Sequence, residues 1–162
     1  MNTNLNDPNT SQETGASRNW KMISLVLIGI LGLMQLGQFV IPEFRLDNPP
    51  VTQTVNWDSP QTERLWNQAC ADCHSNETVY PWYSYIAPIG WLVAHDTHEG
   101  RDNLNISTDE RVDVREIVEV IREGEMPMPI YTITHADARL TDAQRQALID
   151  GLLATFSVTN RQ

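Results

Sequence analysis

The chain has 162 residues, of which 21 are acidic and 11 are basic, and its formal net charge is −10. This length suits one domain with an appendage. From Glu43 onward there are nineteen acids and nine bases, so the charge lies almost entirely in the C-terminal part. Such a field disfavours nucleic acid and anionic surfaces as partners, and it favours a basic protein.

Residues 1–19 are rich in Asn, Thr and Ser and contain almost no apolar side chains, which is typical of a disordered tail. Residues 23–41 carry no charge and are about as long as the stretch that spans a bilayer core. We therefore expect a cytoplasmic tail over residues 1–19 and a single transmembrane signal anchor over residues 20–42.

A cleaved signal peptide is the alternative interpretation of this apolar stretch. The stretch is long for the apolar region of a signal peptide, and no Ala-x-Ala-like site follows it. Gln35 and Gln38 lower its hydrophobicity. These two side chains would face a partner helix or lie at the level of the lipid headgroups.

Basic residues orient the apolar stretch only weakly. Arg18 and Lys21 precede it, and the positive-inside rule places that end in the cytoplasm. Arg45 on the other side makes the bias slight. Residues 42–58 carry three prolines and little periodicity, so we expect an extended linker over residues 43–58.

Residues 59–162 show helical signals and no sustained strand alternation, which predicts an all-α domain of about four helices. The loops between them are expected at 75–88 and 125–140, where prolines gather. The first expected helix runs from Ser59-Pro60 into the first cysteine, and the second covers about 89–99 and is ended by Gly100. The third covers about 108–123; it is opened by the capping box Ser107-x-x-Glu110 and ended by Gly124. The last helix is capped by Thr141-x-x-Gln144.

Cys70-Ala71-Asp72-Cys73-His74 has the C-x-x-C-H spacing of a c-type haem attachment site. Thiols at this spacing lie on one helical turn, so both can form thioethers with one porphyrin edge while His74 supplies the proximal imidazole. A half zinc site, a thioredoxin-like pair and a structural disulfide are the alternatives. The chain has no other cysteine and no βαβ pattern. We expect one covalently attached haem c, and therefore a periplasmic domain.

The segment Met126-Pro127-Met128-Pro129 offers a distal ligand for the same iron. Met126 is favoured because it directly follows the helix stop at Gly124-Glu125, and Met128 is the runner-up. His/Met ligation fills both axial positions and raises the redox potential, which suits outer-sphere electron transfer. The alternative is that both methionines fill the core.

Histidines outside the motif compete for metal roles. His95 and His98 are one turn apart on an expected helix, a spacing that allows chelation of a metal ion. Exposure of such a pair to solvent is the commoner case. His95 is also a minor candidate for the distal iron ligand, and His135 lies in a polar loop.

Further motifs surround the C-x-x-C-H. They are Asn48-Pro49-Pro50-Val51, Trp57-x-Ser59-Pro60, Ser75-Asn76-Glu77-Thr78, Pro81-Trp82-Tyr83-Ser84, Ile86-Ala87-Pro88, Trp91-Leu92-Val93, Gly100-Arg101, Leu104-Asn105, Gly124-Glu125-Met126-Pro127 and His135-x-Asp137-Ala138-Arg139-Leu140. With these motifs the chain resembles, over about residues 48–155, the bacterial "haem-binding domain" family of membrane-anchored monohaem c-type cytochromes. The resemblance implies a cytochrome c-like fold with one covalent haem, and it supports Met126 as the distal ligand.

Several polar and aromatic residues are candidates for contacts with the haem. Trp82 and Tyr83 are expected to form part of the wall of the haem pocket, with packing in the domain core as the alternative. Arg101 and Asn105 are candidates for bonds to the haem propionates, and surface positions are equally expected for both.

The leading functional hypothesis is a membrane-anchored carrier of single electrons, and not a catalyst on its own. It would lie in the cytoplasmic membrane with its N-terminus in the cytoplasm and its haem domain in the periplasm. A permanent haem c subunit of a larger respiratory or photosynthetic complex is the alternative. A haem-based redox or gas sensor is less favoured, since it needs an output module.

The expected helix at about 108–123 carries acids at steps of three and four residues or their multiples, namely Asp109, Asp113, Glu116 and Glu123. Glu125 follows beside Met126. We expect these acids to form a docking face for a basic redox partner, and a solvated helix surface is the alternative.

Overall fold

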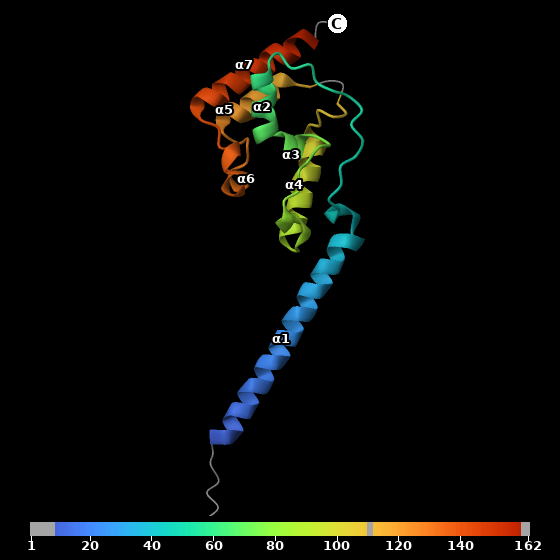
Figure 1. Cartoon of the computed structure of the whole chain (residues 1–162), viewed down its shortest axis with the longest axis vertical. Coiled ribbons are helices and arrows are strands. Elements are labelled where there is room, and N and C mark those ends of the chain that lie inside the picture. Colours follow the sequence, from blue (N-terminus) through green and yellow to red (C-terminus); the bar gives the residue numbers. More distant parts are fainter. Residues whose placement is uncertain (1–8, 110–111, 160–162) are drawn as a thin grey trace, which may run out of the picture.

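The computed structural model describes residues 9–109 and 112–159, and all regular elements in those ranges are helical. One long helix, α1 (Asn9–Val40), extends away from a domain built from the other helices (Figure 1). The expectation of an all-α protein with one N-terminal apolar helix is therefore confirmed.

Helix α1 is long and apolar enough to cross a membrane. Its segment Asn19–Val40 has a mean hydropathy of 2.0, and only 6 % of its most apolar window is buried against the rest of the protein. The helix begins at Asn9, so residues 9–19 are helical, whereas the sequence predicts a disordered tail there. The remainder of that expected tail, residues 1–8, lies outside the described residues.

The C-terminal end of α1 is hydrogen-bonded to the domain. The Gln35 side chain donates from Nε2 to Tyr85 O over 3.0 Å, and its Oε1 accepts from Ala87 N over 3.1 Å. Gln38 is only 4 % exposed, and its Nε2 donates to Phe44 O over 2.8 Å. Both glutamines therefore bond the protein's own backbone, which the sequence did not predict.

The expected linker is extended but fixed to the domain. After the short 3-10 helix η1 (Pro42–Phe44), Phe44 stacks on Trp91 with ring centroids 4.6 Å apart. Further along, Arg101 donates to Asp47 O and to Asn48 Oδ1. These bonds hold the segment against the domain surface, so it does not act as a free tether.

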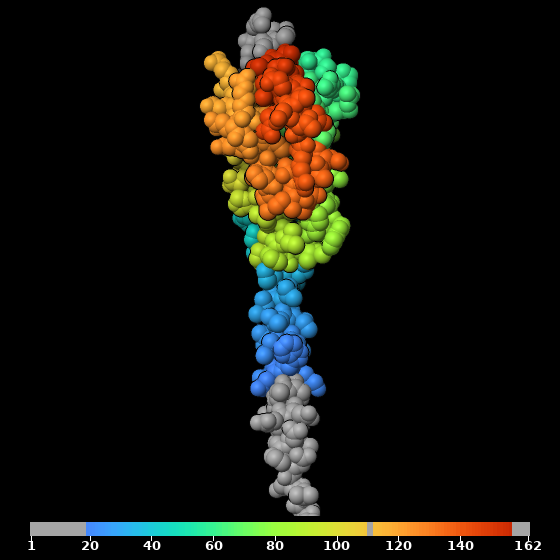
Figure 2. Space-filling view, turned by 90° about the vertical axis from the view of Figure 1, so that its left-hand side faces the viewer, coloured from blue at the N-terminus to red at the C-terminus, as the bar shows by residue number. Residues whose placement is uncertain are grey.

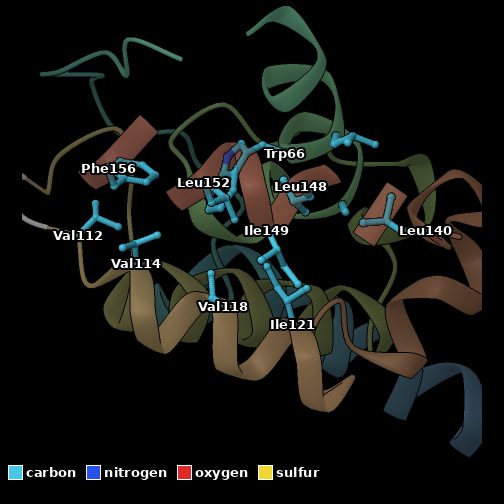
Figure 3. Close-up of a cluster of buried hydrophobic side chains, with 12 residues drawn as sticks. Trp66, Val112, Val114, Val118, Ile121, Leu140, Leu148, Ile149, Leu152 and Phe156 are labelled. Atoms are coloured by element: carbon cyan, nitrogen blue, oxygen red, sulfur yellow. The ribbon is translucent and has the colours of Figure 1, made fainter. Parts of the chain in front are cut away.

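Three helices enclose the apolar core: α2 (Pro60–Ala69), α5 (Val114–Glu123) and α7 (Asp142–Thr159). Figure 3 shows the side chains that fill the space between them. The largest contributors are Trp66, Val118, Ile121, Leu148, Ile149, Leu152 and Phe156. Burial of this apolar surface, at about 25 cal/mol per Å², is the main stabilising contribution to the domain.

Local capping signals set the starts of α2 and α7 as expected. Ser59 Oγ accepts from Thr62 N over 3.2 Å, with Pro60 in the first turn. At α7, Thr141 N donates to Gln144 Oε1 over 2.9 Å, and Gln144 N donates to Thr141 Oγ1, which completes the reciprocal capping box.

Helices α2 and α7 cross at a glycine. A Cβ atom placed on Gly151 would lie 2.0 Å from Thr62 Oγ1 and 2.7 Å from Thr62 Cγ2. Only a residue without a side chain fits at this crossing. The close approach brings α2, which leads into the C-x-x-C-H, directly against the C-terminal helix.

Helix α4 (Ile89–Asn103) runs four residues past the expected end at residue 99, and Gly100 lies inside it. The expected loop before α4 contains the 3-10 helix η2 (Trp82–Tyr85). At its far end, α4 is followed by Leu104, whose backbone N–H donates to Gly100 O over 2.9 Å. Glycine at position 100 therefore does not stop the helix; it allows α4 to contact Cys73 closely.

Helix α5 begins at Val114 and not at about 108. Its N-cap is Asp113, which accepts from Arg115 N over 3.0 Å. Glu110 of the expected capping box lies outside the described residues. The expected loop over 125–140 also contains a helix, α6 (Pro129–Thr134), and the 3-10 helix η3 (Ala136–Ala138).

Candidate haem site

A partly open cavity of about 630 Å³ lies between the core helices and α4. This volume falls in the range of about 300–1,000 Å³ that small-molecule and cofactor pockets occupy. The sequence-predicted ligands meet there, because the cavity lining includes Cys70, Cys73, His74, Met126 and Met128.

Cys70 is the N-cap of a one-turn helix, α3 (Ala71–His74), and Cys73 lies within it. His74 N donates to Cys70 O over 3.0 Å. Both cysteines are free. Enclosure raises the pKa of Cys70 to about 12, and burial together with the nearby Asp72 carboxylate raises that of Cys73 to about 11. Both side chains are therefore protonated thiols at neutral pH.

The imidazole of His74 is held in one orientation. Its Nδ1 lies 3.1 Å from Leu104 O, so Nδ1–H donates to that carbonyl and Nε2 keeps its lone pair for a metal ion. Burial lowers the pKa of His74. The ring is therefore kept in the neutral form that binds metals.

Gly100 lets α4 approach the C-x-x-C-H turn. A Cβ atom placed on Gly100 would lie 2.6 Å from Cys73 O and 2.8 Å from Cys73 Cβ. Because the backbone of α3 would have to move, the position excludes every side chain. Sequence reasoning treated this glycine only as a helix stop; its position inside an otherwise helical pattern is the signal of a packing role.

The methionine segment returns to the cavity through a left-handed turn. Gly124 ends α5 with φ +76°, a conformation that favours glycine, and Met126 N then donates to Val120 O over 3.2 Å. Arg145 Nη1 bonds Ile121 O from α7 over 2.9 Å. Both Met126 and Met128 reach the cavity, so the choice between them stays a prediction.

A hydrogen bond connects the methionine segment to the C-x-x-C-H turn. Tyr131 Oη, on α6, donates to Asp72 Oδ2 over 2.8 Å. Burial raises the pKa of Tyr131, and the bond to the carboxylate adds to the rise. The other oxygen of Asp72 accepts from Val79 N over 3.0 Å. The residue between the two cysteines therefore positions α6, a role that sequence reasoning missed.

The structure does not place the expected aromatic wall at the cavity. Trp82 is 75 % exposed, and neither it nor Tyr83 belongs to the cavity lining. The aromatic side chains that line the cavity are Trp66 and Tyr131. Helical spacing could have indicated Trp66, since it lies one turn before Cys70 and eight residues before His74.

Trp66, which lines the cavity, also has a buried polar group without a partner. Its side chain is 1 % exposed, and its Nε1–H has no acceptor among the described residues. A buried donor without a partner is costly.

The two histidines of α4 do not act as a pair. His95 lines the cavity and lies 3.6 Å from Asp96 Oδ1, whereas Nε2 of His98 lies 3.9 Å from Asp47 Oδ1. No cluster of three or more His, Cys, Asp or Glu side chains suited to a metal ion occurs within the described ranges. His135 packs on Tyr131 with ring centroids 4.0 Å apart.

Arg101 and Asn105 hold protein backbone and side chains, and neither lines the cavity. Arg101 Nε donates to Ser75 O over 2.9 Å, directly after the C-x-x-C-H turn. Asn105 is buried, and its Nδ2 donates to Asn76 Oδ1 over 2.8 Å. Both side chains therefore stabilise the turn and are not free to bond propionates.

The polar part of the cavity lining is acidic. Within the described residues it contains no Lys or Arg, and its acids are Asp96, Glu99, Asp109, Asp113 and Glu116. Asp109 accepts from Asn105 N over 2.7 Å, and Asp113 caps α5, so these two carboxylates have structural roles. Glu116 remains exposed, whereas Glu123 lies outside the lining.

An all-helical fold that brings C-x-x-C-H and two methionines to one cavity defines a haem-binding class of protein. The model of the family described as "Haem-binding domain" matches residues 29–154, and the chain belongs to this family. No curated protein and no solved structure gives a significant match to the chain. The family match begins within α1, so the end of this helix is part of the matched region.

Proposed function

We propose that this haem-binding protein is a membrane-anchored monohaem c-type cytochrome that carries single electrons between redox partners. The observation that carries the proposal is the meeting of Cys70, Cys73, His74, Met126 and Met128 in one cavity. A bound haem supplies one-electron exchange at its iron. The protein would hold one such group.

Each ligand residue has a distinct role in this proposal. Cys70 and Cys73 form thioethers when each S–H adds across a vinyl double bond of the porphyrin, a step that needs no oxidant. His74 supplies the proximal imidazole through Nε2, since Nδ1 is held by Leu104 O. Met126 supplies the distal thioether, with Met128 as the runner-up. Ile117 and Val120 form part of the apolar wall of the cavity, which would pack against the porphyrin.

We also propose that α1 is retained as a single-pass anchor in the cytoplasmic membrane. The bonds of Gln35 to Tyr85 O and Ala87 N support retention, because removal of α1 would leave those groups without partners. The N-terminus would lie in the cytoplasm. The haem domain would lie in the periplasm, the side on which c-type haem is attached.

The carrier role, as opposed to catalysis, is supported by two features. His74 and one methionine thioether, which line the same cavity, would together fill both axial positions of a haem iron, and this suits outer-sphere electron transfer. The acidic lining around Glu116 favours a basic redox protein or a basic surface of a membrane redox complex.

A permanent haem c subunit of a larger respiratory or photosynthetic complex is the alternative function. The sequence argument for it used Gln35 and Gln38 as contacts for a partner helix, and both side chains bond this protein's own backbone. Gentle solubilisation of the native membrane distinguishes the two functions. A free carrier migrates alone, whereas a permanent subunit co-migrates with its complex.

Loss of both thiols tests the haem assignment directly. In a Cys70→Ala/Cys73→Ala variant, haem should no longer stay with the polypeptide on a denaturing gel, because no thioether can form. Wild-type protein should keep its haem through extraction with acidified acetone. Haem released from the wild type by this extraction would overturn the proposal of covalent attachment.

A further inference from the structure

One end of the domain is apolar and exposed. We call Trp82, Tyr85, Ile86, Ile89 and Leu92 the η2–α4 apolar face. Their exposed fractions are 75, 52, 47, 51 and 51 %, respectively. The sequence from residue 79 to residue 94 contains no charged side chain, in a protein whose net charge is −10. This stretch of the domain therefore carries no charge of its own.

This face lies beside the apolar helix and not beyond its end. Gln35 is bonded to the backbone of Tyr85 and Ala87, and it precedes Val40, the last residue of α1, by five residues. At about 1.5 Å per residue, the bonded turn lies about 7.5 Å below the end of the helix. The segment around η2 must lie at the same depth.

Close packing fixes this position. A Cβ atom placed on Gly90 would lie 2.1 Å from Ser84 O and 2.6 Å from Gln38 Oε1, and one placed on Gly37 would lie 3.3 Å from Trp91 Cζ2. Figure 1 shows the lower end of α4 level with the upper end of α1. In Figure 2 the same green end is the lowest part of the domain, directly above the bare helix.

We propose that the η2–α4 apolar face inserts into the bilayer interface beside α1, so that the haem domain is held against the membrane surface. The inference rests on the proposed anchoring by α1. Trp and Tyr are enriched at the level of the lipid headgroups, and amphipathic elements bury their apolar side about 5–10 Å into that region. The depth of η2 beside α1 falls in this range.

The orientation defines which partners the domain reaches. Helix α4 carries both the apolar face and a wall of the cavity, which includes Asp96, Gly100 and Asn103. Asn103 follows Leu92 by eleven residues, which corresponds to about 16 Å of helix. The cavity therefore lies within this distance of the membrane surface along α4. The partners are redox proteins whose cofactor lies close to the same surface.

Photo-crosslinking to lipid tests the proposal with the full chain in phosphatidylcholine/phosphatidylglycerol vesicles. The photoreactive residue p-benzoylphenylalanine replaces Leu33, Ile89 or Val51 in three separate proteins. These apolar side chains are exposed by 71, 51 and 43 %, respectively. Leu33 reports on the anchor, Ile89 on the apolar face, and Val51 on the linker, where Thr52 N bonds Ser107 O.

Mass spectrometry of the crosslinked lipid gives an unambiguous outcome. Lipid attached at positions 33 and 89 but not at 51 supports the proposal. Lipid at position 33 alone overturns the proposal and leaves the anchor intact. Absence of lipid at position 33 overturns the anchor itself, and with it this inference.

A second variant tests the cause of the orientation. A Gln35→Ala/Gln38→Ala chain loses the side-chain bonds to Tyr85, Ala87 and Phe44. Crosslinking at position 89 should then fall towards the level at position 51, while crosslinking at position 33 stays unchanged. Unchanged crosslinking at position 89 would show that these glutamines do not hold the face in place.

Discussion

The two sides of the cavity are built differently. The turn that carries Cys70, Cys73 and His74 is held by the bond of His74 to Leu104 O, by the packing of Cys73 on Gly100, and by Arg101 bonded to Ser75 O. The segment that carries the methionines is held by the left-handed turn at Gly124, by Met126 N bonded to Val120 O, and by Tyr131 bonded to Asp72.

This difference assigns different tasks to the two sides. The cysteine side is formed in advance, because its imidazole and thiols are positioned by neighbouring backbone and by a glycine that no other residue can replace. In the proposed cytochrome, the methionine side, held by Gly124 and Tyr131, is the side at which an iron ligand would be exchanged.

Gly100→Ala should disrupt the cysteine side. The new Cβ atom would lie 2.6 Å from Cys73 O, and α4 and α3 would have to separate. Overpacking of this kind costs about 1–3 kcal/mol in the free energy of unfolding. We expect less haem per polypeptide on a stained denaturing gel and a lower melting temperature by circular dichroism.

Gly32→Ala is the matched control for this prediction. Gly32 also lies in a helix, and no atom lies within 4 Å of a Cβ placed on it. The control should keep wild-type haem content and melting temperature. Equal haem content in both variants would show that the Gly100 contact does not position the cysteine turn.

Met126→Ala should open the methionine side without loss of covalent haem. The ferric sulfur-to-iron absorption band should disappear, and the ferrous protein should bind carbon monoxide, because the distal position is no longer filled. Met128→Ala is the control, since Met128 lines the same cavity. If only the Met128→Ala variant shows these changes, Met128 is the distal ligand.

Tyr131→Phe should weaken the methionine side by a smaller amount. It removes the 2.8 Å bond to Asp72 Oδ2, and loss of one hydrogen bond to a charged group costs about 1.5 kcal/mol. We expect a lower denaturant midpoint and faster binding of carbon monoxide than in the wild type, with the sulfur-to-iron band retained.

Tyr85→Phe is the control for loss of a phenol. The Tyr85 side chain is 52 % exposed, and no hydrogen bond of its hydroxyl occurs within the described residues. This variant should match the wild type in both measurements. If Tyr131→Phe also matches the wild type, the bond to Asp72 does not hold the methionine segment in place.

The sequence predicted the cysteine side better than the methionine side. Cys70, Cys73 and His74 form one short motif, so local sequence alone indicates that they lie together. The Ser59 and Thr141 caps likewise bond within four residues, so the helix starts that they set can be predicted from local sequence. The start of α5 was predicted too early, because Asp109 bonds Asn105 N and does not begin the helix.

Tertiary contacts account for the other differences between the expectations from sequence and the structure. The bond between Tyr131 and Asp72 spans 59 positions, and α6 lies where prolines predicted a loop. Trp82 and Tyr83 were expected to form part of the wall of the haem pocket. The structure instead places η2 against the end of α1, through Gln35, so Trp82 faces outward.

The smallest expected effect concerns the charge at the cavity. Glu116 and Glu123 lie two turns apart on α5, but only Glu116 lines the cavity. Glu116→Gln should lower the rate of electron transfer with a basic partner roughly two- to five-fold at low ionic strength, because one steering charge is lost. Glu123→Gln removes the same charge farther from the cavity and should have less effect. The difference should vanish as salt is raised, since the Debye length falls to about 10 Å at 0.1 M.

Stopped-flow kinetics across a salt series measure both variants against the wild type. Unchanged rates for both at low salt would rule out this side of α5 as the docking surface, and would leave the haem ligands as proposed.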